Sequence, residues 1–219
     1  MVFFRLCAMN LLNIKTFDSR NRAKICLVVV WVTASCGGIA LLQLYASTAA
    51  TTLNAPSQWP SESNLPLSEH GATLVLFAHP KCPCTRATLG ELEKIVARFH
   101  GSFTPWVVFL KPDGVAEDWD QTDLRRTADA IPSVHVVSDP GGSLAKQFQA
   151  TTSGQVFLYN SEGKLLFQGG ITASRGHAGD NEGRSAIEAC LQDTAPMYRQ
   201  TSVFGCPISL PCDVQKANQ

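Results

Sequence analysis

The stretch Leu74-Val75-Leu76-Phe77-Ala78-His79-Pro80-Lys81-Cys82-Pro83-Cys84-Thr85 decides the fold of this chain. Its apolar run, residues 74–77, predicts a short buried strand. From Thr85 onward apolar residues recur at helical spacing, which predicts a helix over 85–99. Cys82 and Cys84 therefore fall at a strand-to-helix junction, in the first helical turn. Because unpaired backbone N–H groups and the positive end of the helix dipole stabilise a thiolate there, thiol chemistry is the leading hypothesis.

The Cys-Pro-Cys pair allows three interpretations. In the first, Cys82 attacks a substrate disulfide and Cys84 resolves the mixed disulfide, a reaction that needs no cofactor. In the second, the same thiolates bind copper together with His79 or His177, since soft thiolates and imidazole suit Cu(I). In the third, the pair is a structural disulfide or two inert thiols. A Cys-x-Cys bridge closes a very small, strained ring, however, and a strained bridge is a poor staple.

Length and charge limit the classes of function. The 219 residues are enough for one ordinary domain plus an extension. The 18 basic and 18 acidic residues balance, so no nucleic-acid partner is implied. The balance hides a basic N-terminal tail, residues 1–24, in which only Asp18 opposes the basic side chains of Arg5, Lys15, Arg20, Arg22 and Lys24.

An uncharged run, residues 25–46, follows the basic tail. It matches the roughly 20 residues that a membrane helix needs and exceeds a typical signal-peptide core. The positive charges before it place the N-terminus in the cytoplasm. We therefore expect a single-pass membrane protein whose domain lies outside the cytoplasm. Two alternatives are cleavage near residues 48–50 and a lipoprotein site at Cys36, although the apolar run continues past Cys36.

The cysteines divide between compartments. Of the eight, Cys7 would be cytoplasmic, and Cys26 and Cys36 would lie in the membrane. The exported part then keeps an odd number, so one thiol is left over: Cys82, Cys84, Cys190, Cys206 and Cys212. Cys190 shares a predicted helical face with Ile187 and Leu191, which favours core packing for this thiol.

The rest of the chain divides into three parts. Residues 47–70 are rich in Ser, Thr, Pro and Asn and predict a flexible linker; residues 71–192 form the domain, and residues 193–219 form a cysteine-containing tail. The domain predicts strands at 73–77, 106–110, 134–137, 156–159 and 165–167 and helices at 85–99, 122–130, 144–148 and 181–191. This β-α-β-α-β-α-β-β-α order predicts an α/β fold, a mixed sheet with helices on both faces.

The order of elements, with a cysteine pair at the start of the first helix and a terminal strand hairpin, resembles the thioredoxin-like fold over most of residues 71–191. The resemblance is closer to bacterial RedB-type membrane-anchored proteins. It rests on the blocks 79–84, 152–154, 169–172, 176–181 and 204–207. It implies a membrane-associated redox protein whose partners are protein thiols or disulfides. With the expected topology, it also implies a location in the bacterial inner membrane with the domain in the periplasm.

Two departures from ordinary thioredoxins affect the chemistry. The usual Cys-x-x-Cys is shortened by one residue. The cis-proline that faces the cysteines in thioredoxins is also absent, and Thr152-Ser153-Gly154 takes its place. In thioredoxins this proline discourages metal binding, so its absence favours the copper alternative.

The expected surroundings of the cysteines come from three segments: the turn with His79, Pro80 and Lys81, the segment Thr152, Ser153 and Gly154, and the glycine-rich loop with His177 and Asp180. His79 is interpreted as a proton shuttle, a third metal ligand, or a strand-end histidine with a satisfied hydrogen bond. His177 is interpreted as lining the site. Asp180 or Asn181 has the alternative role of N-cap for the last helix.

Cys206 and Cys212 lie beyond the last predicted helix, in a proline-bearing tail. A structural disulfide between them would tie down the terminus. Alternatively, they are a relay pair or metal ligands that fold back toward Cys82.

Overall fold

The structure, a computed structural model, describes residues 19–208 and divides into two compact units, one up to Tyr45 and one from Ala46 onward. The first unit is the helix α1 (Ser19–Ser47). Its segment Arg20–Ser47 has a mean hydropathy of 2.4, is long enough to cross a membrane, and includes the expected span 25–46. A membrane anchor and a signal sequence both have this length and composition.

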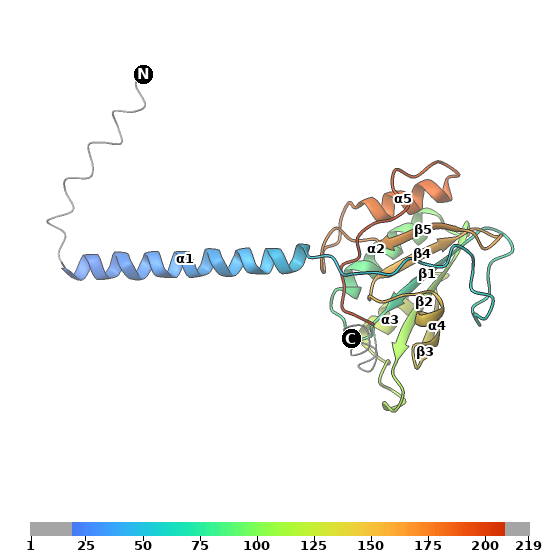
Figure 1. The fold of residues 1–219 in the computed structure, drawn as a ribbon, viewed down its shortest axis with the longest axis horizontal. Helices are drawn as coiled ribbons and strands as arrows, with labels where there is room; N and C mark the ends of the chain where they lie inside the picture. Colours follow the sequence, from blue (N-terminus) through green and yellow to red (C-terminus); the bar gives the residue numbers. More distant parts are fainter. Residues whose placement is uncertain (1–18, 209–219) are drawn as a thin grey trace, which may run out of the picture. The chain divides into compact units, whose positions relative to one another are not determined.

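The second unit is built on a five-stranded mixed sheet in the order β3-β2-β1-β4-β5 (Figure 1). The strands β1, β2 and β3 are parallel, and β4 and β5 continue the sheet antiparallel to β1 and to each other. Their bounds are Ala72–Ala78 for β1, Phe103–Lys111 for β2, His135–Pro140 for β3, Gln155–Tyr159 for β4 and Leu165–Gly170 for β5. The β-α-β-α-β-α-β-β-α order predicted from the sequence is confirmed.

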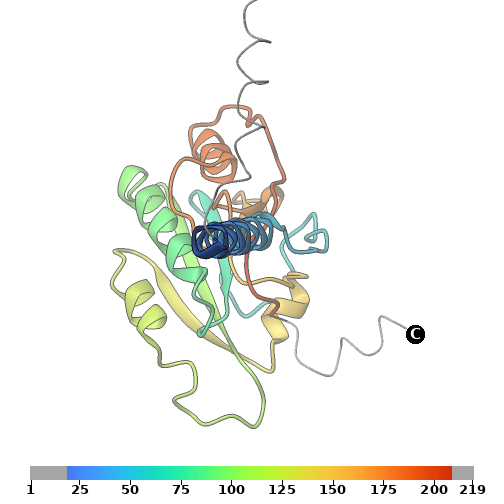
Figure 2. The same cartoon turned by 90° about the vertical axis from the view of Figure 1, so that its left-hand side faces the viewer.

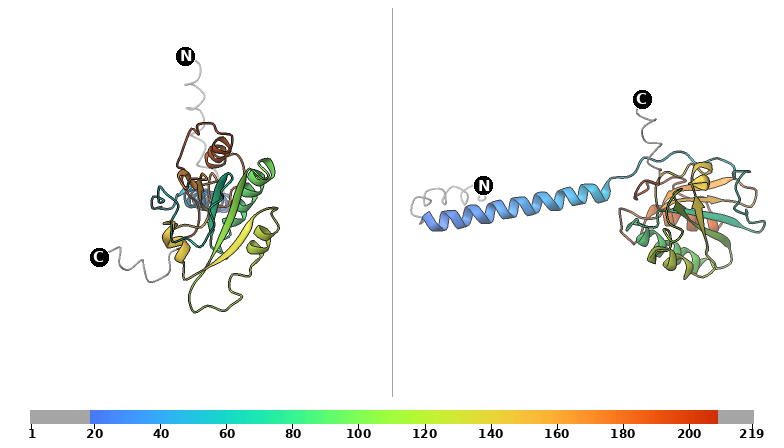
Figure 3. Two further views of the ribbon diagram at one scale, coloured as in Figure 1. Left: turned by 90° about the vertical axis from the view of Figure 1, so that its right-hand side faces the viewer. Right: turned by 90° about the horizontal axis from the view of Figure 1, so that it is seen from below.

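Helices cover both faces of the sheet, as Figure 2 and the left view of Figure 3 show. The helices α2 (Thr85–Arg98), α3 (Asp123–Asp129) and α5 (Glu182–Leu191) pack on one face, and α4 (Ser143–Gln147) packs on the other. Because side chains alternate along a strand, β1 serves both cores. Leu74 and Leu76 are buried toward α2 and α5, and Val75 and Phe77 toward α4. This is the thioredoxin-like arrangement that the sequence predicted.

The bounds of β3 differ from the predicted strand 134–137. The strand continues through Asp139 and Pro140, which the sequence assigned to a turn, and they pair with Leu110 and Lys111 of β2. Pro140 is tolerated because it is the last residue of an edge strand. Asp139 accepts hydrogen bonds of 2.9 Å from the backbone N–H groups of Leu144 and Ala145, so its buried carboxylate anchors the start of α4.

The segment predicted as a flexible linker, residues 47–70, is instead docked on the domain. Leu65 is buried, and the ring of Trp59 packs edge-on against Phe148 and Tyr159 at 5.0 and 5.2 Å between ring centroids. The Tyr159 hydroxyl donates a hydrogen bond of 3.0 Å to the carbonyl of Pro56. The prediction was wrong because the few apolar residues in this polar segment bury themselves on the α4 face.

The C-terminal segment is also part of the domain as far as it is described. The backbone N–H of Gln168 in β5 donates to the carbonyl of Arg199, and the N–H of Thr201 donates back to Gln168. Val203 and Ile208 are buried. The predicted tail 193–219 therefore contributes to the fold at least to Ile208, because these residues extend the sheet edge and fill gaps in the core.

Candidate functional site

The turn between β1 and α2 carries the two predicted site cysteines. The backbone N–H of Cys82 donates to the carbonyl of His79, and the N–H of Thr85 donates to the carbonyl of Cys82, each at 3.1 Å. Cys84 is the N-cap residue of α2 and has helical backbone angles, φ −65° and ψ −27°. The Cys82 side chain is 1% exposed, whereas Cys84 is partly exposed. The two cysteines thus lie at the positive end of α2.

A third thiol lies against the first. The Sγ atoms of Cys82 and Cys206 are 3.0 Å apart, a thiol–thiol hydrogen bond between residues 124 positions apart in the chain. The sequence left two roles open for Cys206, a structural bridge to Cys212 or a thiol that folds back toward Cys82. Its position matches the second, and Cys212 lies outside the described residues.

Backbone pairing holds Cys206 in place. The carbonyl of Cys206 accepts a hydrogen bond of 2.8 Å from the N–H of Ser153, and the N–H of Ile208 donates to Thr151 at 2.8 Å. An antiparallel bridge between Thr152 and Pro207 lies between them. The preceding Gly205 approaches so closely that an added Cβ would collide with the Ser153 carbonyl. Contacts with residues 151–153 therefore fix the position of the segment Gly205–Ile208.

Electrostatics favour a thiolate at Cys82. Burial acts to raise the pKa of the Cys82 thiol, but hydrogen bonds from Cys206, from the backbone of Cys206 and Cys84 and from the Thr85 side chain outweigh it, so the pKa is lowered. Burial and the neighbouring Cys82 raise the pKa of Cys206 to about 12. These opposite shifts of the two pKa values favour ionisation of Cys82 before Cys206.

The pKa of Cys84 is shifted upward, opposite to the shift of Cys82. Burial, the charge of Cys82 and a hydrogen bond with Cys82 raise the pKa of the Cys84 thiol. The guanidinium of Arg175, which hydrogen-bonds Cys84, acts against this rise. Arg175 also donates a hydrogen bond to the carbonyl of Gly205. One cation from the glycine-rich loop thus contacts both the Cys-Pro-Cys turn and the segment that carries Cys206.

The segment that replaces the thioredoxin proline lies beside the cysteine turn. The Oγ of the buried Ser153 accepts a hydrogen bond of 2.8 Å from the N–H of His79 and lies 2.8 Å from Oγ1 of Thr85. The N–H of Gly154 donates to the carbonyl of Phe77 at 2.8 Å. Ser153 thus ties both ends of the turn to the start of β4, and Thr152 is buried next to it.

His79 is engaged away from the sulfurs. Its Nδ1 accepts a hydrogen bond of 3.1 Å from the N–H of Lys81, and its ring packs edge-on against Trp119 with centroids 5.5 Å apart. The Lys81 ammonium lies 4.6 Å from the Trp119 ring centre, a cation–π contact. Burial and then the charge of Lys81 lower the pKa of His79. Pro80 is buried within the same turn.

The glycine-rich loop brings Arg175 to the cysteines, whereas His177 and Asp180 of the same loop are exposed to solvent. His177 is exposed in a turn closed by a bridge to Ser174. Asp180 is fully exposed and forms an ion pair of 2.7 Å with Arg184. Of the two candidate N-caps for α5, Asn181 has this role, because its side chain accepts from the N–H of Arg184 at 2.8 Å.

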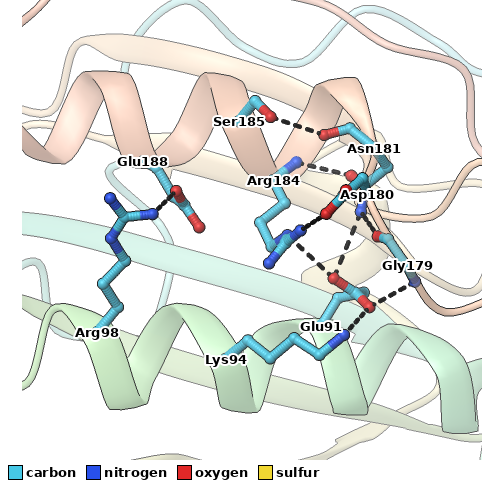
Figure 4. A network of polar contacts seen from close by, with 9 residues as sticks. All are labelled: Glu91, Lys94, Arg98, Gly179, Asp180, Asn181, Arg184, Ser185 and Glu188. Atoms are coloured by element: carbon cyan, nitrogen blue, oxygen red, sulfur yellow. Dashed lines mark hydrogen bonds and ion pairs between the residues drawn. The ribbon is translucent and has the colours of Figure 1, made fainter.

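A buried carboxylate fixes this loop against α2. Glu91, whose side chain is 0% exposed, lies 3.1 Å from Nε of Arg184 and accepts hydrogen bonds from Lys94 at 2.7 Å and from the N–H of Gly179 at 2.8 Å (Figure 4). The amide nitrogen of Asn181 lies 3.5 Å from Oε2, the oxygen that also faces Arg184. The network links α2, α5 and the end of the loop that carries Arg175.

Sequence reasoning missed or underrated two residues that contact the cysteine turn. Arg175 was noticed only as one member of the glycine-rich loop, and Cys206 was given a structural role as readily as a reactive one. The odd number of exported cysteines was the available signal for Cys206, because an unpaired thiol in an oxidising compartment needs a partner. The remaining cysteine, Cys190, packs against the core as expected, and burial raises its pKa.

The copper alternative named Cys82, Cys84, His79 and His177 as ligands. Within residues 19–208, no group of three or more His, Cys, Asp and Glu side chains is arranged so that it could hold a metal ion. The hydrogen bond from Lys81 already occupies Nδ1 of His79. The two sulfurs in contact, those of Cys82 and Cys206, are soft donors of the kind that suits Cu(I), and among the described residues they number only two.

Comparisons with known proteins found solved structures of similar fold. No family model and no curated protein match the chain. A hypothetical protein from Sinorhizobium meliloti is 22% identical, with TM-score 0.53 and 75% of this chain and 96% of that chain covered. An uncharacterized conserved protein from Geobacillus kaustophilus is 16% identical, with TM-score 0.54 and coverages of 76% and 94%.

A third solved structure is less similar. A secreted disulfide oxidoreductase from Mycobacterium tuberculosis is 11% identical, with TM-score 0.42 and 57% of this chain and 82% of that chain covered. At these identities the similarities concern the fold alone. The closer resemblance to RedB-type proteins stays a prediction.

Proposed function

We propose that this protein is a thiol–disulfide oxidoreductase, anchored in the membrane by α1 and active outside the cytoplasm. Cys82 is the nucleophile, and Cys84 is a resolving thiol in the Cys-Pro-Cys pair. The partners are protein thiols or disulfides, and the reaction uses no cofactor. The observation that carries the proposal is the position of Cys82 beside the N-terminal end of α2, with its Sγ 3.0 Å from the Sγ of Cys206; the lowered pKa of Cys82 agrees with it.

The chemistry follows from the thiolate. Cys82 attacks one sulfur of a substrate disulfide, the substrate S–S bond breaks, and the leaving thiolate takes a proton. A second thiol of the site then attacks Cys82 Sγ and releases the reduced substrate. Because each step is reversible, the same site oxidises a substrate dithiol when it starts from its own disulfide. Arg175 stabilises the thiolate of Cys84, the state in which this thiol attacks.

The surroundings of the turn support a recognition surface for proteins. The exposed Lys81 lies over Trp119, and this pair borders the turn that holds Cys82. Ser153 stands in the place of the thioredoxin proline. Its hydroxyl accepts from the N–H of His79, and its own backbone N–H donates to the carbonyl of Cys206. We infer that the substrate approaches from the side of Cys84 and Lys81, where the side chains are exposed.

A Cu(I) site on the same cysteines is the second candidate, favoured by the contact between the sulfurs of Cys82 and Cys206. It differs from the first candidate in its use of the sulfurs, because bound copper would block their exchange.

Exchange with oxidised glutathione tests the first proposal on the full chain in detergent. The parent protein and a Cys190→Ser control should form protein disulfides and release reduced glutathione, and Cys82→Ser should lose at least 100-fold of the rate, about 2.7 kcal/mol of barrier. A Cys82→Ser variant that exchanges as fast as the parent would refute the assignment of the nucleophile.

A further inference from the structure

The contact between the sulfurs of Cys82 and Cys206 is unusually short for two cysteines that are not bonded. Their sulfurs lie 3.0 Å apart, and a disulfide needs about 2.05 Å, so a displacement of about 1 Å would join them. Cys84 also makes a hydrogen bond with Cys82, but a bridge between these two would close a very small, strained ring.

The position of Cys206 is built into the fold. The segment from Gly205 to Ile208 pairs with residues 151–153, and Ile208 is buried under the α4 face. The guanidinium of Arg175 holds the Gly205 carbonyl from the other side. Cys206 is therefore presented to Cys82 by contacts that do not depend on either thiol.

We propose that Cys206 is a further resolving thiol and that a Cys82–Cys206 disulfide is the first oxidised state of this site. The inference rests on the proposed function, since it needs Cys82 to form a mixed disulfide with a substrate. It changes the order of events, because Cys206 attacks before Cys84 does.

The steps balance as follows. The Cys82 thiolate attacks a substrate disulfide, one S–S bond breaks and a mixed disulfide forms, while the first substrate thiolate leaves and is protonated. Cys206 loses its proton to solvent and attacks Cys82 Sγ, and the second substrate thiolate leaves and is protonated. The substrate gains two electrons, and Cys82 and Cys206 lose two.

Cys84 acts after this step. Its thiolate, stabilised by Arg175, attacks Cys82 Sγ, the Cys82–Cys206 bond breaks, and Cys206 leaves as a thiolate and is protonated. The exchange involves no net oxidation or reduction. It moves the bridge from Cys206 to the Cys-Pro-Cys turn, where the partly exposed Cys84 borders the exposed Lys81.

A single-turnover experiment tests the order on the reduced full chain in detergent. The protein is mixed with oxidised glutathione, quenched with acid at increasing times and mapped by mass spectrometry of its peptides. The Cys82–Cys206 bridge should appear first and the Cys82–Cys84 bridge later. Cys206→Ser should accumulate glutathione on Cys82 and close an internal bridge at least 10-fold more slowly, whereas Cys190→Ser should match the parent.

A second variant leaves every thiol in place. Gly205→Ala introduces a Cβ that collides with the Ser153 carbonyl and displaces Cys206 from Cys82. It should lower the yield of the Cys82–Cys206 bridge at least 5-fold without preventing glutathione from reacting with Cys82.

The outcomes separate the two proposals. If glutathione never reacts at Cys82, the proposed function and this inference both fail. If exchange occurs but Cys82–Cys84 forms first, Cys206 bridges to Cys212, or Cys206→Ser closes its bridge as fast as the parent, only the inference is overturned.

Discussion

A carboxylate oxygen of Glu91 lies 3.1 Å from Nε of Arg184, and this ion pair joins the helix that begins at the cysteines to the last helix. Glu91 is 0% exposed and Arg184 is 19% exposed in their side chains. A charge in that position is stable only while it is paired and hydrogen-bonded, since its removal from water is costly. The pair therefore holds α5 and the preceding loop in register with α2.

Glu91→Ala should destabilise the domain by about 3 kcal/mol, because it leaves Arg184 without its buried partner and the N–H of Gly179 without its acceptor. Denaturant unfolding of the full chain in detergent, followed by tryptophan fluorescence, measures this loss. The matched control is Asp123→Ala, which breaks the exposed ion pair with Arg86 and should cost much less, because solvent screens an exposed pair. Equal losses in the two variants would contradict the structural role of Glu91.

The Cys82 thiol should ionise at a lower pH than an ordinary cysteine, whose pKa is about 8.5. A thiolate forms as the pH rises through the pKa, so a lowered pKa means that more Cys82 thiolate exists at neutral pH. Cys206→Ala removes a hydrogen bond to that thiolate and should move the Cys82 transition to higher pH. Absorbance at 240 nm, taken as the difference from Cys82→Ser, reports the thiolate even though the side chain is buried.

The control for this titration is Cys190→Ala, which should leave the Cys82 transition in place. Cys206 itself, whose pKa is raised to about 12, should contribute no thiolate signal near neutral pH. A Cys82 transition above the ordinary cysteine range, or one that Cys206→Ala lowers, would contradict the electrostatic account of the site.

His177→Ala should change both glutathione exchange and Cu(I) binding by less than about 2-fold, because the side chain is exposed in the turn closed by Ser174. Cys82→Ser should abolish exchange and weaken any Cu(I) binding, since a sulfur donor is lost. Competition with a Cu(I) chelator and the glutathione assay measure the two activities. Stoichiometric Cu(I) binding lost in both variants, with negligible exchange in the parent, would favour the copper function instead.

The basic residues before α1 predict that the domain lies outside the cytoplasm. A reporter enzyme that is active only outside the cytoplasm, fused after Gln219, should be active, and a cytoplasm-only reporter at the same position should be silent. Replacement of Arg20, Arg22 and Lys24 by Asn should weaken this orientation. The opposite pattern of reporter activity in the parent would reverse the assigned topology.

Local patterns in the sequence predicted most of the fold. The apolar run before His79 is β1, the helical spacing after Thr85 is α2, and the turn at Asn160 joins β4 to β5. Each of these signals lies within a few residues of the element that it predicts, because strand and helix periodicity follow from which face is buried. The position of Cys82 and Cys84 at the junction followed from the same local signals.

Boundaries and docked segments were less predictable. The Ser/Thr-rich residues before β1 have the composition of a linker, yet Trp59, Leu65 and Leu67 pack on the core and hold them on the domain. The assignment of a turn at Asp139 and Pro140 rested on their local preference, whereas pairing with β2 keeps them in β3. In both places contacts with distant residues outweigh the local preference.

The sequence by itself determined the order of strands and helices, the apolar helix near the N-terminus and the placement of two cysteines at the start of α2. Only the tertiary structure decided that Cys206 meets Cys82, that Arg175 contacts Cys84, and that Ser153 holds the turn at His79. The physical reason is the separation in sequence. Contacts between residues more than 70 positions apart depend on how the sheet brings its strand ends together, and no local periodicity records them.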